Sequence, residues 1–227
     1  MNTPQRSRPV VLLFDVNETL LDLGPLEESI DEVLLENGAS RLWFTTMLQY
    51  SLVLTVGGKF ETFIDVGAAT LVMLARNREV VLTLDEAQRA LKPMLNLAPH
   101  QDVLDSLAHL KQAGFRLASL SNSSINACRS QLEYAGLTQM FERQLSVESV
   151  GKYKPHGDVY RWAAKEMKVA EQDCMLVAAH AWDVAGAAWT GMQTAFIERK
   201  GNQPFPLALA PSLCASDLHN LADQLGA

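Results

Sequence analysis

The stretch that decides the fold is Val10-Val11-Leu12-Leu13-Phe14-Asp15-Val16-Asn17-Glu18-Thr19-Leu20-Leu21-Asp22. Its apolar first half has the length and the continuous hydrophobic character of a strand buried on both faces of a parallel sheet. Such a strand delivers Asp15 to the carboxyl edge of the sheet, where open α/β folds bind their ligands. A carboxylate at that edge can act as a covalent nucleophile. Taken alone, the stretch is equally compatible with Asp15 capping a helix that starts near Pro25.

The composition is that of an ordinary globular protein with an acidic charge balance. The 227 residues are 48% hydrophobic and 20% charged, with a formal net charge of −7 at pH 7. This length accommodates one large domain, or a core domain that carries an inserted one. Lys and Arg are scattered along the chain, which argues against a nucleic-acid-binding face. An anionic substrate stays compatible, because a pocket can be locally positive.

Cysteine usage and hydropathy predict a soluble, cytoplasmic protein. Cys128, Cys174 and Cys214 are widely spaced and form no CxxC pair, as expected for reduced thiols and not for a disulfide framework or a zinc site. The apolar run after the polar residues 1–9 is too short for a signal peptide. No window approaches the length of a membrane span, so we expect no membrane partner.

Residues 24–99 show helical periodicity with little strand character. Apolar residues recur at helix spacing through most of this segment, and Gly38, the pair at 57–58 and Pro93 punctuate it. Either Thr83 or Asp85 is placed to cap its last helix. The segment therefore predicts an all-helical unit of about four helices.

Beyond residue 99, strands and helices alternate. Strand character occupies 115–122, 144–147, 175–180 and 194–199, and helical character 103–113, 125–134, 158–167 and 185–189. Gly114 is placed to end the first of these helices. The alternation predicts a doubly wound, Rossmann-like α/β core with a parallel sheet. We therefore expect a core domain of residues 1–23 and 100–227, with residues 24–99 inserted after the first strand as an all-helical cap domain.

Polar groups stand at the ends of three predicted strands and in one loop. They are Asp15 with Thr19, Ser121 with Asn122, His180 with Asp183, and Lys154 in front of Pro155. Singly, each has an ordinary structural explanation, as a capping turn, a helix cap or a solvated lysine. The carboxyl ends of parallel strands meet at one edge of the sheet, however. Four such groups in strand-end order therefore indicate a site.

The motifs that carry these groups resemble those of the haloacid dehalogenase superfamily. They are Asp15-Val16-Asn17-Glu18-Thr19-Leu20, Leu120-Ser121-Asn122-Ser123, Tyr153-Lys154-Pro155 and Ala181-Trp182-Asp183. Within the superfamily the chain most resembles the type II 2-haloacid dehalogenases, from Val10 to about Arg199, and its helical block matches their cap. The resemblance implies a metal-independent hydrolase that needs no cofactor and cleaves the carbon–halogen bond of a small anionic 2-haloacid. Members of that family commonly pair, which hints at a homodimer.

The resemblance also implies a role for each matching residue. Asp15 matches the nucleophile, which forms an aspartyl ester that water then hydrolyses. Lys154 matches the lysine that keeps this carboxylate ionised, as an opposite charge within about 4–6 Å does. Asp183 matches the aspartate that holds the lysine and helps to position water. The other matches are Thr19 and Ser121 as hydroxyls bonded around the nucleophile, Val16, Asn17 and the Ser121-Asn122 pair as substrate and halide contacts, and Tyr160 as a neighbour of the site.

Position 17 separates the branches of the superfamily. Phosphatases carry a second aspartate there as a general acid, and an acidic pair near the last motif that holds Mg²⁺. Here position 17 is Asn17, and Ala178 and Ala179 precede His180, leaving Asp183 without an acidic neighbour. A Mg²⁺-dependent small-metabolite phosphatase is the alternative hypothesis. It requires another acid, and the nearest is Glu18, whose side chain we expect to point elsewhere.

Two residues depart from the dehalogenase pattern. Phe44 stands where the family carries an arginine that receives the halide, with Arg41 about one helical turn away. His180 stands where the family usually has asparagine, and it can donate to halide or activate water, since its ordinary pKa lies near neutrality. The alternative is a histidine merely hydrogen-bonded at a strand end. Trp182 is expected to line the pocket. The loss of the arginine is the sole support for a non-catalytic binding module.

Overall fold

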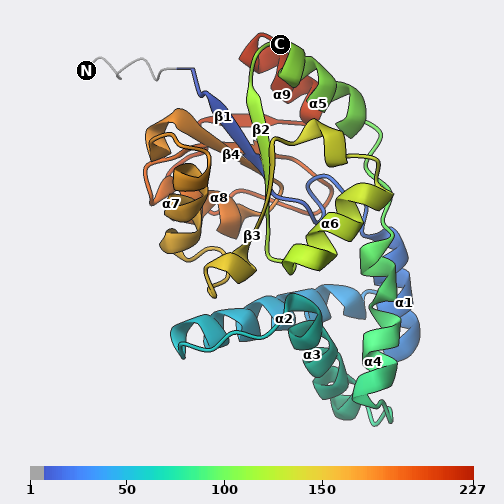
Figure 1. The fold of residues 1–227 in the computed structure, drawn as a ribbon. Coiled ribbons are helices and arrows are strands. Elements are labelled where there is room, and N and C mark those ends of the chain that lie inside the picture. The colour runs from blue at the N-terminus through green and yellow to red at the C-terminus, as the bar shows by residue number, and fades with distance from the viewer. Residues whose placement is uncertain (1–7) are drawn as a thin grey trace.

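The computed structural model describes residues 8–227, and within them six strands form one parallel sheet (Figure 1). The sheet has the order β3-β2-β1-β4-β5-β6. Its strands are β1 (Val11–Phe14), β2 (Arg116–Ser121), β3 (Arg143–Ser146), β4 (Cys174–Ala178), β5 (Gln193–Ile197) and β6 (Leu213–Ala215). This is the order of a doubly wound, Rossmann-like sheet, so the predicted fold class is confirmed.

β1 lies at the centre of the sheet because its residues are apolar on both faces. Val11, Leu12, Leu13 and Phe14 are all fully buried. β1 pairs in parallel with β2 on one side and β4 on the other. The strand order reverses between β1 and β4, and crevices that bind ligands form at such switch points, outside the carboxyl ends of the strands. The residue that follows β1 is Asp15.

The core helices follow the predicted alternation with one shift and one extension. They are α5 (Val103–Gln112), α6 (Ile125–Tyr134), α7 (Gly157–Glu166), α8 (Ala181–Ala188) and α9 (Leu218–Leu225), with short 3-10 helices η2 (Thr138–Met140), η3 (Val147–Ser149) and η4 (Glu171–Asp173). Gly114, at φ 90°, follows the end of α5 as predicted. The prediction that the helix begins at residue 185 was wrong. β4 stops at Ala178, and His180 takes the N-cap position of α8, so Asp183 lies in the first helical turn. β6 and α9 lie beyond the predicted elements.

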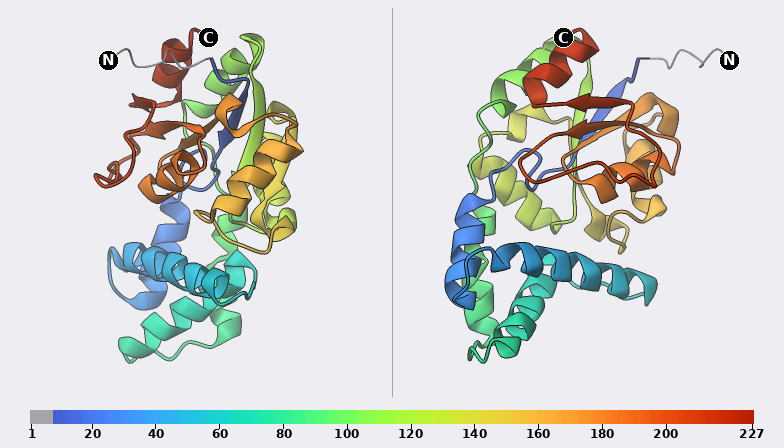
Figure 2. Two further views of the ribbon diagram at one scale, coloured as in Figure 1. Left: turned by 90° about the vertical axis from the view of Figure 1, so that its left-hand side faces the viewer. Right: turned by 180° about the vertical axis from the view of Figure 1, so that it is seen from behind.

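The segment between β1 and β2 contains the predicted helical insertion. It consists of α1 (Gly24–Leu34), α2 (Ala39–Val56), α3 (Phe63–Asn77), α4 (Leu84–Ala90) and the 3-10 helix η1 (Lys92–Leu95). The helices pack mainly on one another and lie as a separate layer below the carboxyl edge of the sheet (Figures 1 and 2). Thr83, not Asp85, caps α4, and a reciprocal bond from Thr83 to Glu86 completes the capping box.

A buried tryptophan fixes the packing of the insertion. Trp43 of α2 is 1% exposed, and its indole N–H donates to the carbonyl of Gly67 in α3 at 2.8 Å. A Cβ at position 67 would lie 3.1 Å from the Trp43 ring, so glycine allows this approach. This contact fixes the position of α2, and with it the position of the next residue, Phe44, relative to the core domain.

Within the described part of the chain, no helix is both long enough and apolar enough to cross a membrane. The expectation about a signal peptide concerns a segment whose first residues, 1–7, lie outside the described residues.

Candidate active site

Lys154 is the centre of the site at the carboxyl edge of the sheet. It is fully buried in the loop between β3 and α7. Its ammonium group donates to Asp15 Oδ1 at 2.8 Å, to Asp183 Oδ2 at 2.6 Å and to the carbonyl of Leu120 at 2.8 Å. An ammonium group has three hydrogens, so every one has a partner. The ammonium group of Lys154 thus connects its own loop to β1, β2 and α8.

This arrangement sets the ionisation of the nucleophile candidate. Burial alone would raise the pKa of Asp15, but the charge of Lys154 and a hydrogen bond from His180 outweigh it and hold that pKa well below its usual range. Burial would lower the pKa of Lys154, and the charges of Asp15 and Asp183 raise it instead. Burial also raises the pKa of Asp183, against the pull of Lys154. Asp15 is therefore an anion, 5% exposed, at the end of β1.

Of the two hydroxyls expected around Asp15, only Thr19 bonds to it. Thr19 Oγ1 donates to Asp15 Oδ2 at 2.8 Å and accepts from the N–H of Ala179 at 2.9 Å. Ser121 differs from the expectation. Its Oγ accepts a bond from the N–H of Ser123 at 3.0 Å, because the chain turns immediately after β2. Ser121 therefore holds that turn, while Thr19 fixes the orientation of the carboxylate.

Tyr160 contacts Asp183. It is fully buried, and its hydroxyl donates to Asp183 Oδ1 at 2.6 Å. The resemblance implies that Tyr160 is a neighbour of the site, and in the structure its hydroxyl is bonded to Asp183. Gly186 of α8 makes the arrangement possible: a Cβ there would overlap Pro155 and lie 2.7 Å from the Tyr160 hydroxyl.

His180 bridges two carboxylates. Its Nδ1 lies 3.1 Å from Asp15 Oδ2, and its Nε2 lies 2.7 Å from Glu18 Oε2. Burial alone would lower the pKa of His180, but the hydrogen bonds and charges of Asp15 and Glu18 raise it to about 9. At neutral pH the ring is therefore an imidazolium that donates from both nitrogens. The rings of Phe44 and Trp182 stack near it, with centroids 5.5 Å and 5.1 Å away.

Glu18 is the functional residue that sequence reasoning missed. We expected its side chain to point elsewhere, but its backbone adopts φ 64°, which turns the carboxylate toward His180. Asn202 donates to its second oxygen at 2.9 Å, and the His100 ring binds its carbonyl at 3.0 Å. A left-handed conformation at a residue other than glycine persists only where its surroundings hold it. No local sequence signal announces such a turn.

Asn122 offers the site an unused donor. Its Oδ1 accepts from the backbone N–H of Lys154 at 3.0 Å, and its buried Nδ2 has no hydrogen-bond partner among residues 8–227. Asn17 is less available. Its Oδ1 accepts from Gln131 Nε2 at 2.9 Å, and Gln131 Nε2 also donates to the carbonyl of Met94 in η1 at 2.9 Å. The carbonyl of Val16 accepts from two N–H groups of the following turn. Asn17 thus links core and insertion as well as flanking Asp15.

Phe44 and Arg41 are placed differently by α2. Phe44 is partly buried and reaches His180. Arg41 is exposed, and a Cβ built at Gly201 would lie 3.5 Å from its guanidinium group. Arg41 therefore lies over the 199–202 turn and makes no ion pair with Asp15 within the described residues. The cation on this side of Asp15 is His180.

The donor set does not fit Mg²⁺. Within residues 8–227, no three His, Cys, Asp or Glu side chains are grouped so that they could hold a metal ion. Position 17 carries an amide already bonded to Gln131, and both oxygens of Asp183 are taken by Lys154 and Tyr160. A divalent cation would also have to lie beside the buried ammonium group of Lys154.

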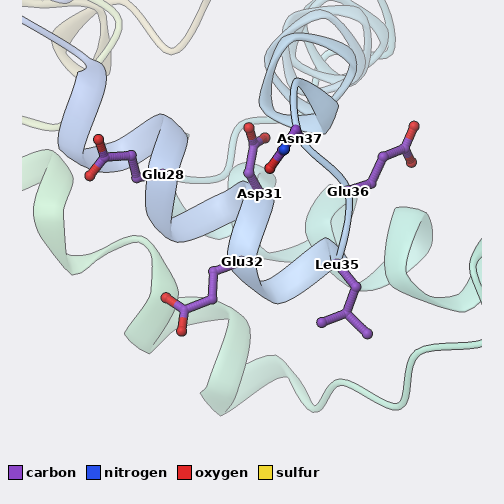
Figure 3. Close-up of a pocket in the computed structure, with 6 residues that line it drawn as sticks. All are labelled: Glu28, Asp31, Glu32, Leu35, Glu36 and Asn37. Atoms are coloured by element: carbon purple, nitrogen blue, oxygen red, sulfur yellow. The ribbon is translucent and has the colours of Figure 1, made fainter.

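A surface hollow at the end of α1 lies apart from these residues (Figure 3). It is lined by Glu28, Asp31, Glu32, Leu35, Glu36 and Asn37. Its carboxylates would repel an anion, and we assign it no role in the reaction.

Fold and site together define a haloacid dehalogenase-like hydrolase. The sequence profile of that family matches residues 10–191, and the chain belongs to the family. It is 31% identical to the (S)-2-haloacid dehalogenase of Pseudomonas sp. strain YL over 193 residues, covering 84% of this chain and 83% of that protein. It is 28% identical to haloacetate dehalogenase H-2 of Moraxella sp. strain B, covering 84% and 86%. L-2-haloacid dehalogenase from Xanthobacter autotrophicus, solved with chloropropionic acid covalently bound, has the same fold at a TM-score of 0.87. Its identity is 20%, and the match covers 96% of this chain and 98% of that one.

Proposed function

We propose that this chain is a metal-independent hydrolase that cleaves the carbon–halogen bond of short 2-haloacids. The observation that carries the proposal is the state of Asp15: a buried carboxylate, held ionised by Lys154 and oriented by Thr19. Such a group is poised to attack carbon, since an unprotonated, desolvated anion is the reactive form of a carboxylate nucleophile. The names of the relatives in Pseudomonas and Moraxella support the same reaction.

In this reaction an Asp15 oxygen forms a bond to the α-carbon while the halide departs with the electron pair of the carbon–halogen bond. The product is an aspartyl ester. A halide leaves without a proton, so the reaction does not need the general acid that Asn17 replaces. The second half of the reaction is attack by water, which restores the carboxylate and releases a 2-hydroxyacid.

Substrate size and charge follow from the residues around Asp15. The free Nδ2 of Asn122 and the backbone beside Val16 and Asn17 are suited to the substrate carboxylate. Phe44 and Trp182 enclose the leaving-group side with apolar surface, and His180 supplies its positive charge. We therefore propose a small substrate, such as a two- or three-carbon 2-haloacid.

Halide release from a panel of fluoro-, chloro- and bromoacetate and the 2-halopropionates, with chelator present, tests the proposal. Release without metal is the expected result. If folded protein releases halide from none of these substrates, the proposal is overturned. Cleavage of an aryl phosphate stimulated by Mg²⁺ would favour a phosphatase instead.

We also propose a homodimer that buries the outer face of α2. Leu42, Val53 and Val56 lie on one side of this helix and are 50%, 54% and 90% exposed. Light scattering coupled to size exclusion should give twice the 25.0 kDa chain mass. A Val53→Glu and Val56→Glu double variant should run as a monomer, and an unchanged mass would exclude this surface.

A further inference from the structure

We propose that His180, held by Glu18, is the base that activates water in the second half of the reaction. The inference rests on the proposed function, because it concerns the aspartyl ester which that function creates. It assigns the two carboxylates on either side of His180 different tasks: Asp15 is the nucleophile, and Glu18 positions the ring.

The other candidate base is Asp183, which is closed off from solvent. Its Oδ2 accepts from Lys154 and its Oδ1 from Tyr160, both at 2.6 Å, and it is fully buried. Each oxygen keeps a second lone pair, but Asp183 is completely buried, so a water molecule would have to enter a closed position to reach it. His180 Nδ1 lies 3.1 Å from Asp15 itself. The ring is therefore already beside the carbon that water must attack, and Asp183 serves Lys154.

Formation of the ester changes the surroundings of His180. The groups that face its ring nitrogens are the carboxylates of Asp15 and Glu18. The uncharged rings of Phe44 and Trp182 stack on it, and the charges of Lys154 and Asp183 lie on the other side of Asp15. When Asp15 becomes a neutral ester, one of the two anions that stabilise the imidazolium disappears, while burial still favours the neutral ring. Alkylation of Asp15 thus lowers the pKa of His180 and converts it from an acid to a base.

The protons and electrons of this sequence balance. After the halide has left, His180 releases its Nδ1 proton to solvent. It then takes a proton from water as the water oxygen bonds to Cγ of Asp15, giving a tetrahedral intermediate. Collapse breaks the bond from Cγ to the substrate oxygen, and that oxygen takes a proton from the new carboxyl group. Asp15 is again an anion and His180 again an imidazolium. In total, haloacid and water give hydroxyacid, halide and one proton.

Glu18 acts as a positioning residue. Its carboxylate accepts the Nε2 proton, which leaves Nδ1 as the nitrogen that faces Asp15. The left-handed backbone at Glu18 and the bonds from Asn202 and His100 hold this carboxylate in place. A base whose second nitrogen donates to a carboxylate keeps a single tautomer. The strained turn is therefore explained by the tautomer that it fixes.

Single turnover of (S)-2-chloropropionate, with halide release and intact protein mass followed together, tests the proposal. The variant His180→Gln retains a donor toward Glu18 but cannot take a proton. We expect it to release one equivalent of chloride and then to accumulate an ester on Asp15, with ester decay slowed about 10²- to 10⁴-fold. The exposed His109→Asn is the matched control and should behave as the wild type.

The outcomes separate this inference from the proposed function. A wild-type enzyme that forms no ester and releases no halide refutes the function. If the esters of the wild type and of His180→Gln decay equally fast, His180 is not the base, while the proposed function stands. Slowed chloride release together with an ester that decays at the wild-type rate would confine His180 to the first step, and would also overturn the inference.

Glu18 gives an independent test that does not require His180→Gln to fold. In Glu18→Gln, the pKa of His180, followed by NMR of the ring Cε1 proton in the resting enzyme, should fall below that of the wild type. The pH profile of ester decay should change with it, and Glu18→Asp should restore part of both. An unchanged His180 titration in Glu18→Gln would exclude the positioning role.

Discussion

The hydroxyl of Tyr160 donates to Asp183 Oδ1 at 2.6 Å, opposite the ammonium group of Lys154 on Oδ2. Asp183 is thus held from both sides, by one neutral donor and one cation. Burial, together with the adjacent carboxylate, raises the pKa of Tyr160 well above its ordinary value, so the phenol keeps its proton. The orientation of Asp183, and through it that of Lys154, depends on a side chain that need not touch the substrate.

Tyr160→Phe should therefore reduce both stability and turnover. The substitution leaves one buried oxygen of Asp183 without a donor, which costs about 1–3 kcal/mol of unfolding free energy. Turnover should fall less than for a substitution of Lys154, because Lys154 retains its bond to Asp15. Urea denaturation and halide release measure the two effects. Tyr134→Phe, at a residue 60% exposed, is the control. Unchanged stability of Tyr160→Phe would mean that water replaces the hydroxyl.

Asp15→Asn should abolish halide release, because an amide oxygen is a poor nucleophile and no other group can form the ester. The fold should persist, since asparagine has the shape of aspartate and Lys154 can still donate to an amide oxygen in the place of Oδ1. In ¹⁸O-water, one turnover of the wild type should place the label in Asp15 and not in the hydroxyacid. Asp105→Asn on the surface of α5 serves as the control. Label in the product of that first turnover would show that water attacks the substrate directly.

Lys154→Met should destabilise the protein strongly at neutral pH. Removing the cation leaves the carboxylates of Asp15 and Asp183 buried near each other, and breaking a buried pair in this way costs about 3–5 kcal/mol. The loss should shrink as the pH is lowered, because the two carboxylates then take up protons. Chemical denaturation from about pH 4.5 to pH 8 measures this trend. Lys165→Met, exposed on α7, should show neither effect; a pH-independent loss would contradict the electrostatic explanation.

Stability should also depend on pH through His180, with a definite sign. The folded-state pKa of about 9 lies above the ordinary value of 6.5, so between these values the folded chain holds a proton that the unfolded chain has released. This contribution is complete below the unfolded pKa and is lost as the pH rises through the folded one. The unfolding free energy of the wild type should fall across that window, and that of His180→Gln should fall less. Parallel curves would show that the histidine is not charged in the resting state.

Much of this arrangement could be predicted from the sequence, because it depends on elements and strand ends. The buried run before Asp15, the alternation after residue 99 and the rule that parallel strands end at one edge together bring Asp15, Lys154, His180 and Asp183 to one place. The helical periodicity of the insertion predicted its α-helical character in the same way.

The remainder depends on turns and on packing between distant segments, which leave no local pattern. Glu18 reaches His180 only because of a left-handed backbone, and Ser121 turns to Ser123 instead of Asp15. Gln131 donates to Asn17, 114 residues before it in the sequence, and to the carbonyl of Met94, 37 residues before it. Such partners come together only in the folded chain, so the sequence near each residue does not predict them.

Tyr153, the residue before Lys154, is seated in the helical insertion. Its N–H donates to Thr55 Oγ1, its hydroxyl to the carbonyl of Glu61, and its ring packs against Phe60 and Phe63. Lys154, which holds Asp15 ionised, therefore directly follows a residue that is anchored in the helical insertion. Any motion that withdraws Tyr153 to uncover the nucleophile also pulls on the lysine that keeps it ionised. Access to Asp15 and its ionisation are therefore linked through the peptide that joins Tyr153 to Lys154.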